Sequence, residues 1–455
     1  MSELPGGWTH FALKDLGGLS GGKTPSKANP EFWSSRDIPW VSPKDMKKSF
    51  LEDAEDRISQ IAVDEAGMTL YPSGSVLMVT RSGILQHTFP VALTCVDLTV
   101  NQDIKVLRPV EGIVPKFSFY MLKSFGTEIL TACSKDGTTV QSIESEKLEA
   151  FQFPLPPLAE QTRIAQKLDE LLAQVDTLKA RIDGIPALLK RFRQSVLAAA
   201  VSGRLTEDWR VARMKSGEVD APDAINFQKL SDICLSITDG DHQAPPQSDT
   251  GIPFITISAI NDGVIRLEKA TRYVPDSYYS ELKESRKPQT GDILFSVTGS
   301  ICIPAMVLNE APFTFQRHIA ILRPNTALAL QKFMYFYLGS EQIKKQGLDV
   351  ATGTAQLTVP LKGLRNFDIS LPSLAEQTEI VRRVEQLFAF ADQLAAKVAS
   401  AKSRIDHLTQ SILAKAFRGE LVPQDPNDEP ASVLLERIKT QRAAAPKAKR
   451  GRKSA

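Results

Sequence analysis

One stretch of the sequence has the residue types and the spacing of a phosphate-binding loop. Residues 17–24 (GGLSGGKT) match the pattern G-x-x-x-x-G-K-[ST], with Lys23 and Thr24 as the residues that would contact a nucleotide. Such a loop works between a buried strand and a helix, because N–H groups at the start of the helix bind the phosphates. Pro25 and Pro30 follow the motif and block a regular helix. We therefore interpret residues 17–24 as a glycine-rich surface loop, and a P-loop NTPase that uses them is the alternative.

No other group of residues has a spacing suited to catalysis or to metal binding. The five histidines are scattered, and the four cysteines (Cys95, Cys133, Cys234 and Cys302) include no C-x-x-C pair. The cysteines therefore indicate reduced thiols, and neither a zinc site nor a disulfide framework is expected. The N/D-P-P-aromatic motif of an adenine methyltransferase is absent from the sequence. The sequence thus predicts no catalytic residue, no metal ligand and no cofactor bound by this chain.

Composition indicates an ordinary globular protein of two to four domains. The chain has 455 residues, of which 42% are hydrophobic and 24% charged. It contains neither a secretion signal nor an apolar stretch long enough to span a membrane, so we expect a cytoplasmic location. Its net charge is +2, and residues 439–455 contribute seven positive charges and no acid, which leaves the remainder at −5. A protein that binds DNA chiefly by neutralising phosphates is normally more basic, so a DNA-binding function has to be argued from architecture.

The architecture is indicated by an internal repeat. Residues 155–164 (LPPLAEQTRI) return 216 positions later as residues 371–380 (LPSLAEQTEI), with eight of ten positions identical. The register holds without a gap as far as Gly203 and Gly419. A tandem duplication of this kind predicts two copies of one architecture that pair about a pseudo-two-fold axis.

Each repeat carries ten apolar residues with the alternating spacing of a coiled-coil seam. In the first copy these residues are Ile164, Leu168, Leu171, Val175, Leu178, Ile182, Ile185, Leu189, Phe192 and Val196. In the second copy they are Ile380, Val384, Leu387, Ala391, Leu394, Val398, Ala401, Ile405, Leu408 and Ile412. The pattern predicts long paired helices, about 48 Å from first to last seam position, that start after the prolines and stop at Gly203 and Gly419. We expect Gly184 and Pro186 to break the first helix.

Upstream of each long helix lies a block of about 150 residues of mixed character, as expected for one domain. Shared landmarks include residues 38–41 (IPWV) with 252–255 (IPFI), and short apolar runs bounded by Gly and Pro indicate strands. Residues 117–129 and 331–345 are expected to be helices. Each block is therefore predicted to be an α+β domain. Between the landmarks the blocks have diverged, which is typical of one scaffold that presents two different sets of loops.

The repeated Leu-Pro-x-Leu-Ala-Glu-Gln-Thr openings, the Gln-Ser-[VI]-Leu-Ala segments and the Gly-x-Leu closures closely resemble the specificity subunits of type I restriction–modification systems. Residues 38–46 (IPWVSPKDM) share this resemblance, and residues 188–194 and 380–388 are similar to the type IA branch. Residues 21–26 (GGKTPS) resemble a turn that is frequent in the family, which favours the surface-loop interpretation over the phosphate-binding one.

The resemblance implies two α+β target-recognition domains that alternate with two long helical regions, which pair as an antiparallel coiled coil with a pseudo-two-fold internal repeat. The expected boundaries are 1–152 for the first target-recognition domain, 153–205 for the central helical region (broken near 184–186), 206–226 for a linker, 227–368 for the second target-recognition domain, 369–421 for the C-terminal helical region, and 422–455 for a short helix and a basic tail.

The resemblance also implies a non-catalytic subunit whose two domains each read one half of a bipartite, asymmetric site in double-stranded DNA. The paired helices would set the spacing and recruit two methyltransferase (modification) subunits, which would bind S-adenosylmethionine and methylate adenine at N6. Restriction subunits, with ATP and Mg, would add translocation and cleavage. A coiled-coil scaffold without DNA contact is the structural alternative.

Sequence recognition would use loop side chains that reach base edges in the major groove. We selected candidates by residue type and expected loop position. In the first domain they are Lys23, Lys27, Arg81, Gln86, His87 and Gln141. In the second domain they are His242, Gln243, Thr298, Gln316 and Arg317.

Overall fold

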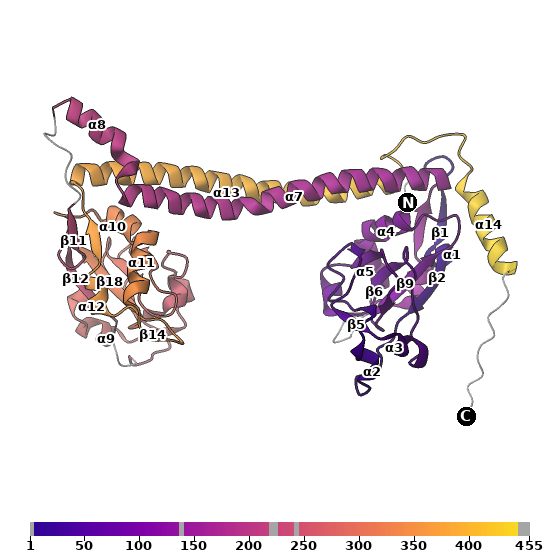
Figure 1. Ribbon diagram of the computed structural model, residues 1–455, viewed down its shortest axis with the longest axis horizontal. Helices are drawn as coiled ribbons and strands as arrows, with labels where there is room; N and C mark the ends of the chain where they lie inside the picture. Colours follow the sequence, from indigo (N-terminus) through magenta and orange to yellow (C-terminus); the bar gives the residue numbers. More distant parts are fainter. Residues whose placement is uncertain (1–3, 136–140, 218–225, 241–244, 445–455) are drawn as a thin grey trace. The chain divides into compact units, whose positions relative to one another are not determined.

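The computed structural model describes residues 4–135, 141–217, 226–240 and 245–444 (Figure 1). The chain folds into two compact units. Unit 1 comprises Met1–Ile182 with Ala401–Ala455, and unit 2 comprises Asp183–Ser400. Each unit holds one α+β domain together with part of each long helix, which confirms the predicted fold class.

The domain of unit 1 is built on a five-stranded sheet with the order β2-β9-β6-β7-β4. The strands are β2 (Gly17–Gly21), β9 (Ile104–Pro109), β6 (Val76–Val79), β7 (Val91–Thr94) and β4 (Phe50–Leu51). A three-stranded sheet consists of β5 (Asp56–Ile58), β3 (Ile38–Val41) and β8 (Thr99–Val100), and β1 (Thr9–Ala12) pairs with β10 (Gln152–Leu155). The runs VLMV in β6 and VALT in β7 are buried along their whole length, as expected for strands covered on both faces.

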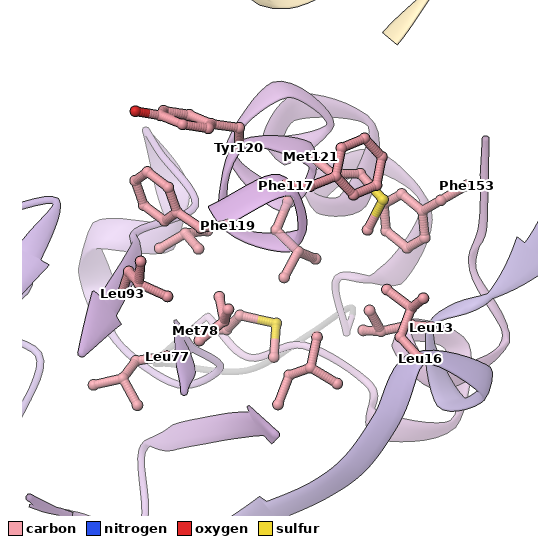
Figure 2. Packing of buried hydrophobic residues seen from close by; sticks show 14 of the residues in the cluster. Leu13, Leu16, Leu77, Met78, Leu93, Phe117, Phe119, Tyr120, Met121 and Phe153 are labelled. Atoms are coloured by element: carbon pink, nitrogen blue, oxygen red, sulfur yellow. The ribbon is translucent and has the colours of Figure 1, made fainter. Parts of the chain in front are cut away.

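Helices complete the core of this domain. They are α1 (Leu13–Leu16), α2 (Glu31–Ser34), α3 (Gln60–Glu65), α4 (Pro115–Ser124), α5 (Gly126–Cys133) and α6 (Ser145–Ala150), with a 3₁₀ segment η1 (Gly83–Gln86). Figure 2 shows Phe117 and Met121 of α4 gathered with Phe153, Leu13 and Leu16 in the core. The single helix expected over 117–129 is therefore two helices, α4 and α5.

The domain of unit 2 has the same arrangement of sheets, with one strand fewer in its main sheet. Its sheet has the order β12-β18-β15-β16, from β12 (Cys234–Asp239), β18 (Ile319–Pro324), β15 (Ile293–Ser296) and β16 (Pro304–Met306). The smaller sheet consists of β14 (Arg272–Val274), β13 (Ile252–Ile255) and β17 (Thr314–Phe315), and β11 (Phe227–Lys229) pairs with β19 (Asp368–Ser370). The helices are α9 (Asp276–Glu281), α10 (Gln331–Leu338), α11 (Glu341–Val350) and α12 (Leu361–Arg365), with η3 (Ile257–Ala259), η4 (Leu267–Lys269) and η5 (Glu284–Arg286). As in unit 1, the helix expected over 331–345 is two helices, α10 and α11.

The two long helices are α7 (Leu158–Val201) and α13 (Leu374–Phe417), each of 44 residues, and their bounds differ by the repeat distance of 216. Gly203 and Gly419 follow them with the same φ of 75°, a left-handed conformation that favours glycine and ends a helix. The predicted break near residues 184–186 is wrong, because α7 continues through Pro186. The proline removes only the hydrogen bond to the carbonyl of Ile182, and its ring is exposed, so the loss stays local.

The helices pair in antiparallel orientation. In unit 1, Ile164, Leu168 and Val175 from the first part of α7 share one core with Ile405 and Ile412 from the last part of α13. In unit 2, the end of α7 packs against the start of α13. The seam prediction fails at Leu178, which is 47% exposed, and at Leu408, which is 46% exposed. The neighbouring seam residues Val175, Ile405 and Ile412 are buried in the core of unit 1.

The segment predicted as a linker is partly helical, and the C-terminal segment contains a short helix. The predicted linker 206–226 begins with η2 (Arg204–Thr206) and a helix, α8 (Glu207–Lys215), and residues 218–225 lie outside the described residues. The short C-terminal helix, α14 (Ala431–Ala444), lies along β1 and α1 (Figure 1), with Leu434 and Ile438 in the core of unit 1. The basic tail from residue 445 also lies outside the described residues.

Candidate nucleic-acid interface

The glycine-rich motif is not a phosphate-binding loop. Gly17–Gly21 forms β2, which pairs with β9 along its whole length, so most of the motif is a strand and the surface-loop interpretation was also wrong for these residues. The next helix is α2, which has four residues and begins only at Glu31. The N–H groups of a helix start therefore do not face Lys23 and Thr24, and the P-loop alternative has no structural basis.

The close crossing at Gly22 explains the glycine at this position. A Cβ atom on Gly22 would lie 1.8 Å from the carbonyl oxygen of Val100. The equivalent residue of the second domain is Gly240, where a Cβ atom would lie 2.2 Å from the carbonyl oxygen of Phe315. In both domains the chain leaving the first strand of the sheet therefore crosses directly over a later turn, and only glycine fits.

In the first domain this later turn comprises residues 101–103. Backbone hydrogen bonds connect it to the loop that begins at Thr80, and connect that loop to residues 141–143. The N–H of Thr80 donates to the carbonyl of Asp103 at 2.8 Å. The N–H of Ser82 donates to the carbonyl of Gln141 at 3.1 Å, and the N–H of Ile143 donates to the carbonyl of Thr80 at 2.8 Å. We call residues 22–27, 80–87, 101–103 and 141–143 the first frame.

The second domain repeats the same hydrogen bonds. The N–H of Val297 donates to the carbonyl of His318 at 2.9 Å, the N–H of Gly299 to Leu357 at 2.8 Å, and the N–H of Val359 to Val297 at 2.8 Å. We call residues 240, 297–299, 316–318 and 357–359 the second frame. The two frames have one backbone geometry and different side chains.

The first frame brings the candidates of the first domain together. Lys23, Lys27, Arg81, Gln86 and His87 are exposed, and Gln141 is half-buried. The turn 101–103 joins them, because the Oγ1 of Thr24 donates to Oε1 of Gln102 at 2.6 Å and Arg81 Nε lies 3.7 Å from Asp103 Oδ1. Gln102 was not selected from the sequence. Its place in the frame follows only from the pairing of β8 with β3 and of β9 with β2 and β6, the strands on either side of it.

The candidates of the second domain differ in exposure, and two of them lie outside the described residues. Arg317 is exposed and Gln316 is half-buried, and both lie in the turn of the second frame. Thr298 is only 7% exposed, and its Oγ1 accepts a hydrogen bond from Thr358 at 3.3 Å, so it holds the frame and presents little surface. His242 and Gln243 lie outside the described residues. His318, which was missed, is half-buried beside Arg317, and burial followed by the Arg317 charge lowers its pKa.

The glutamine of each Leu-Ala-Glu-Gln-Thr segment attaches the long helix to its domain. Gln161 and Gln377 are fully buried. Oε1 of Gln161 accepts from the N–H of Val114, and Oε1 of Gln377 accepts from the N–H of Leu330, which are the N-cap residues of α4 and α10. The amide of each glutamine also donates to backbone carbonyls. Each long helix is thus fixed to the central helix of one domain.

Some contacts of the neighbouring charged residues are the same in both copies, and others differ. Lys116 pairs with Asp169 of α7, and Lys332 pairs with Glu385 of α13 at the equivalent positions. The buried glutamates have different partners, because Glu160 accepts from Trp8 Nε1 at 2.9 Å, whereas Glu376 binds Thr206 and Arg210. Burial raises the pKa of Glu160, against the opposing hydrogen bond from Trp8.

In the described ranges, no three His, Cys, Asp or Glu side chains gather closely enough to hold a metal ion. Across those ranges, no helix has the length and apolarity needed to cross a membrane.

Two copies of one α+β domain, each fixed to a long helix and carrying its own loop frame, define a class of duplicated recognition proteins. The family model described as "Type I restriction modification DNA specificity domain" matches residues 5–187 and again residues 222–400. The chain therefore belongs to this family.

Curated relatives agree with the family match. The chain is 38% identical over 354 residues to the EcoBI specificity subunit of Escherichia coli, covering 74% of each chain. It is 36% identical over 369 residues to the EcoKI specificity subunit of Escherichia coli K12, covering 76% of each. With the EcoDI specificity subunit of Escherichia coli, it is 29% identical over 489 residues and covers 99% of each.

Solved structures show the same fold. The HsdS subunit from Thermoanaerobacter tengcongensis matches with a TM-score of 0.56 at 22% identity, covering 92% of this chain and 99% of that one. A chain from a study of complex assembly and conformational transition of the type I R-M system matches with a TM-score of 0.64 at 21% identity, covering 92% and 100%.

Proposed function

We propose that this chain is the non-catalytic specificity subunit of a type I restriction–modification complex, in which each domain reads one half of a bipartite DNA site. The observation that carries the proposal is the pair of frames. Their backbone hydrogen bonds are the same, whereas their outward side chains differ, as two readers of two different half-sites require. Lys23, Arg81 and Gln102 in the first frame, and Gln316 and Arg317 in the second, are the side chains we assign to base reading.

Membership of the family supports a proposal of partners and cofactors. We propose that two modification subunits and restriction subunits assemble on this chain in the cytoplasm. S-adenosylmethionine, ATP and Mg would bind to those subunits. The long helices, each 44 residues, offer the surface for assembly and would set the distance between the half-sites. The amino-acid sequences of residues 188–194 and 380–388 support the type IA branch.

A domain exchange tests this proposal. Residues 18–148 would be replaced by the equivalent residues of another specificity subunit. This exchange preserves the β1–β10 pair and the contacts of α14 with the backbone of Gly7, Lys14 and Gly17. Methylated adenines would then be mapped by modified-base sequencing of DNA from cells that carry the complete system.

The expected result is a methylated motif in which one half is new and the other half is unchanged. The matched control is an exchange of residues 231–366, between β11 and β19, which should change the other half instead. A motif in which both halves change, or neither changes, after the first exchange would contradict the proposal. A shift assay with the modification subunits present separates this function from a scaffold that makes no DNA contact.

A further inference from the structure

A basic groove of about 760 Å³ lies beside the first frame, within unit 1. Its walls are the turn 43–49, the segment 82–91, residues 123–130 of α4 and α5, and Gln410 of α13. The ionisable groups of this lining are Lys44, Lys47, Lys48, His87 and Lys123. No Asp or Glu from the described part of the chain lines the groove, and five hydroxyl groups from Ser and Thr side chains add hydrogen-bond donors.

Three of the four lysines form no ion pair with a carboxylate among the described residues. Lys44 is ion-paired with Glu55 at 3.0 Å and with Asp56 at 2.8 Å. Lys47 and Lys48 are exposed, and neither forms an ion pair with a residue that the structure describes.

The third, Lys123, is held in a defined position. Its Nζ donates to Ser49 Oγ at 3.0 Å and lies 5.5 Å from the ring centroid of Phe119. The concave wall around Lys123 lowers its pKa by desolvation, and Asp176, the acid that opposes this effect, is not within ion-pair distance. The groove therefore presents three positive charges that form no ion pair within the described part of unit 1, although Asp53 acts on Lys48, and Asp176 on Lys123, from beyond ion-pair distance.

The second domain keeps the scaffold of this groove without its lysines. The turn at residues 42–46 is matched by residues 256–260, because the hydrogen bonds Asp45 N to Ser42 O and Ala259 N to Thr256 O are equivalent. The two residues that follow are Lys47 and Lys48 in the first domain, and Asn261 and Asp262 in the second. At the repeat distance of 216, Lys123 corresponds to Gly339. The fold thus does not need these lysines, which indicates a function that only the first domain performs.

We propose that this groove binds backbone phosphates of the DNA next to the half-site read by the first domain, and that the second domain makes no equivalent contact. This inference rests on the proposed function. Ser82 and His87 belong both to the first frame and to the groove lining, so a strand whose bases meet the frame continues into the groove. Phosphate contacts of this kind fix the position of a protein on the duplex and carry no sequence information.

The groove can be tested in the full chain assembled with its modification subunits. The variants are Lys47→Gln with Lys48→Gln, and the triple variant that adds Lys123→Met. Binding to a duplex containing the mapped motif would be measured over a series of salt concentrations. The slope of log K against log salt is negative, and each lost phosphate contact reduces its magnitude by ~0.9. We therefore expect the magnitude to fall by ~1.8 in the double variant and by ~2.7 in the triple variant. The methylated motif should stay the same. Lys14→Gln with Lys439→Gln, both exposed and outside the groove and the long helices, is the matched control and should leave the slope unchanged.

Neutral phosphates locate the contact. Duplexes that carry a single methylphosphonate at successive positions should bind the wild-type complex more weakly at two or three adjacent phosphates beside the first half-site, and at none in the equivalent place beside the second. The triple variant should show no further loss at those phosphates. An unchanged salt slope, with a motif whose halves still follow the two domains, would overturn the groove and leave the proposed function intact. If the motif does not follow the domains, the proposed function itself fails.

Discussion

The buried glutamine at the start of each long helix allows a quantitative prediction, because the duplication supplies an internal comparison. Gln377→Leu removes three hydrogen bonds, namely those to the N–H of Leu330 at 2.7 Å and to the carbonyls of Leu328 and Pro372, both at 2.9 Å. Gln161→Leu removes two, from the N–H of Val114 and to the carbonyl of Pro156, both at 3.1 Å. Leucine fills a similar volume, so the change isolates the lost polar contacts.

The magnitude follows from the count of bonds. Each bond contributes about 1 kcal/mol, and a buried partner left without a hydrogen bond adds to the loss. We expect Gln377→Leu to lower the free energy of unfolding of unit 2 by ~3–4 kcal/mol, and Gln161→Leu to lower that of unit 1 by ~2–3 kcal/mol. Thr162→Ala and Thr378→Ala are matched controls one residue further along. Both threonines are exposed, and we expect these controls to change stability by less than ~0.5 kcal/mol.

Hydrogen exchange in urea is the appropriate assay, because the two units can unfold separately and a single global transition is not assured. Peptides from α4 report on unit 1, and peptides from α10 report on unit 2. A loss of less than ~1 kcal/mol in Gln377→Leu would refute the role of the glutamine as an anchor. A loss in Gln161→Leu equal to or larger than that in Gln377→Leu would refute the bond count.

Two further predictions concern the long helices. Hydrogen bonds from Arg382, and then from Arg383, lower the pKa of Glu379 to about 2, so the ionised carboxylate stabilises the fold above its ordinary pKa and loses this effect as the pH falls toward 2. The urea midpoint of the Glu379→Gln variant should therefore lie below that of the wild type near neutral pH and approach it at about pH 3. A difference between the two midpoints that stays constant with pH would contradict this prediction. Pro186→Ala restores the hydrogen bond to the carbonyl of Ile182 and should slow hydrogen exchange of the amides of residues 183–190, which corresponds to an increase of about 1–3 kcal/mol in their free energy of local opening. Lys402→Pro, at the equivalent place in α13, should destabilise that helix. Unchanged or faster exchange in Pro186→Ala would show that the proline does not destabilise α7.

The fold could be predicted from the sequence wherever the signal was periodic or repeated. The 216-residue repeat and the seam spacing indicated two long helical regions, and Gly203 and Gly419 marked their ends. The failures have local causes. A single proline does not outweigh the packing on both sides of it in α7, and Leu178 has the spacing of a seam residue but is 47% exposed. Helix α8 was missed because its sequence lacks a continuous apolar stripe, and none of its residues is buried.

The candidate site could be predicted less well, because it is assembled from segments that only strand pairing brings together. Arg81 and Gln141 are far apart in the sequence, and the bridge between Arg81 and Ser142 places them side by side. Residue type suggested Thr298 as a reading position, whereas its side chain is only 7% exposed, because burial is a tertiary property that residue type does not reveal. The groove lysines Lys47 and Lys48 were not among the candidates selected from the sequence, and only the wall formed by α4 and α5 makes them part of one surface.

The difference between the frames and the helix anchors explains how such a chain can change its specificity without losing its fold. The frames are held by backbone N–H and carbonyl groups, which every residue except proline supplies, so their outward side chains are free to vary. The anchors use the side chains of Gln161 and Gln377 in buried sites, where a substitution leaves unsatisfied partners. Variation is therefore tolerated where bases are read and costly where the helices are attached. This is the same division that the sequence shows between its diverged loops and its repeated Leu-Ala-Glu-Gln-Thr segments.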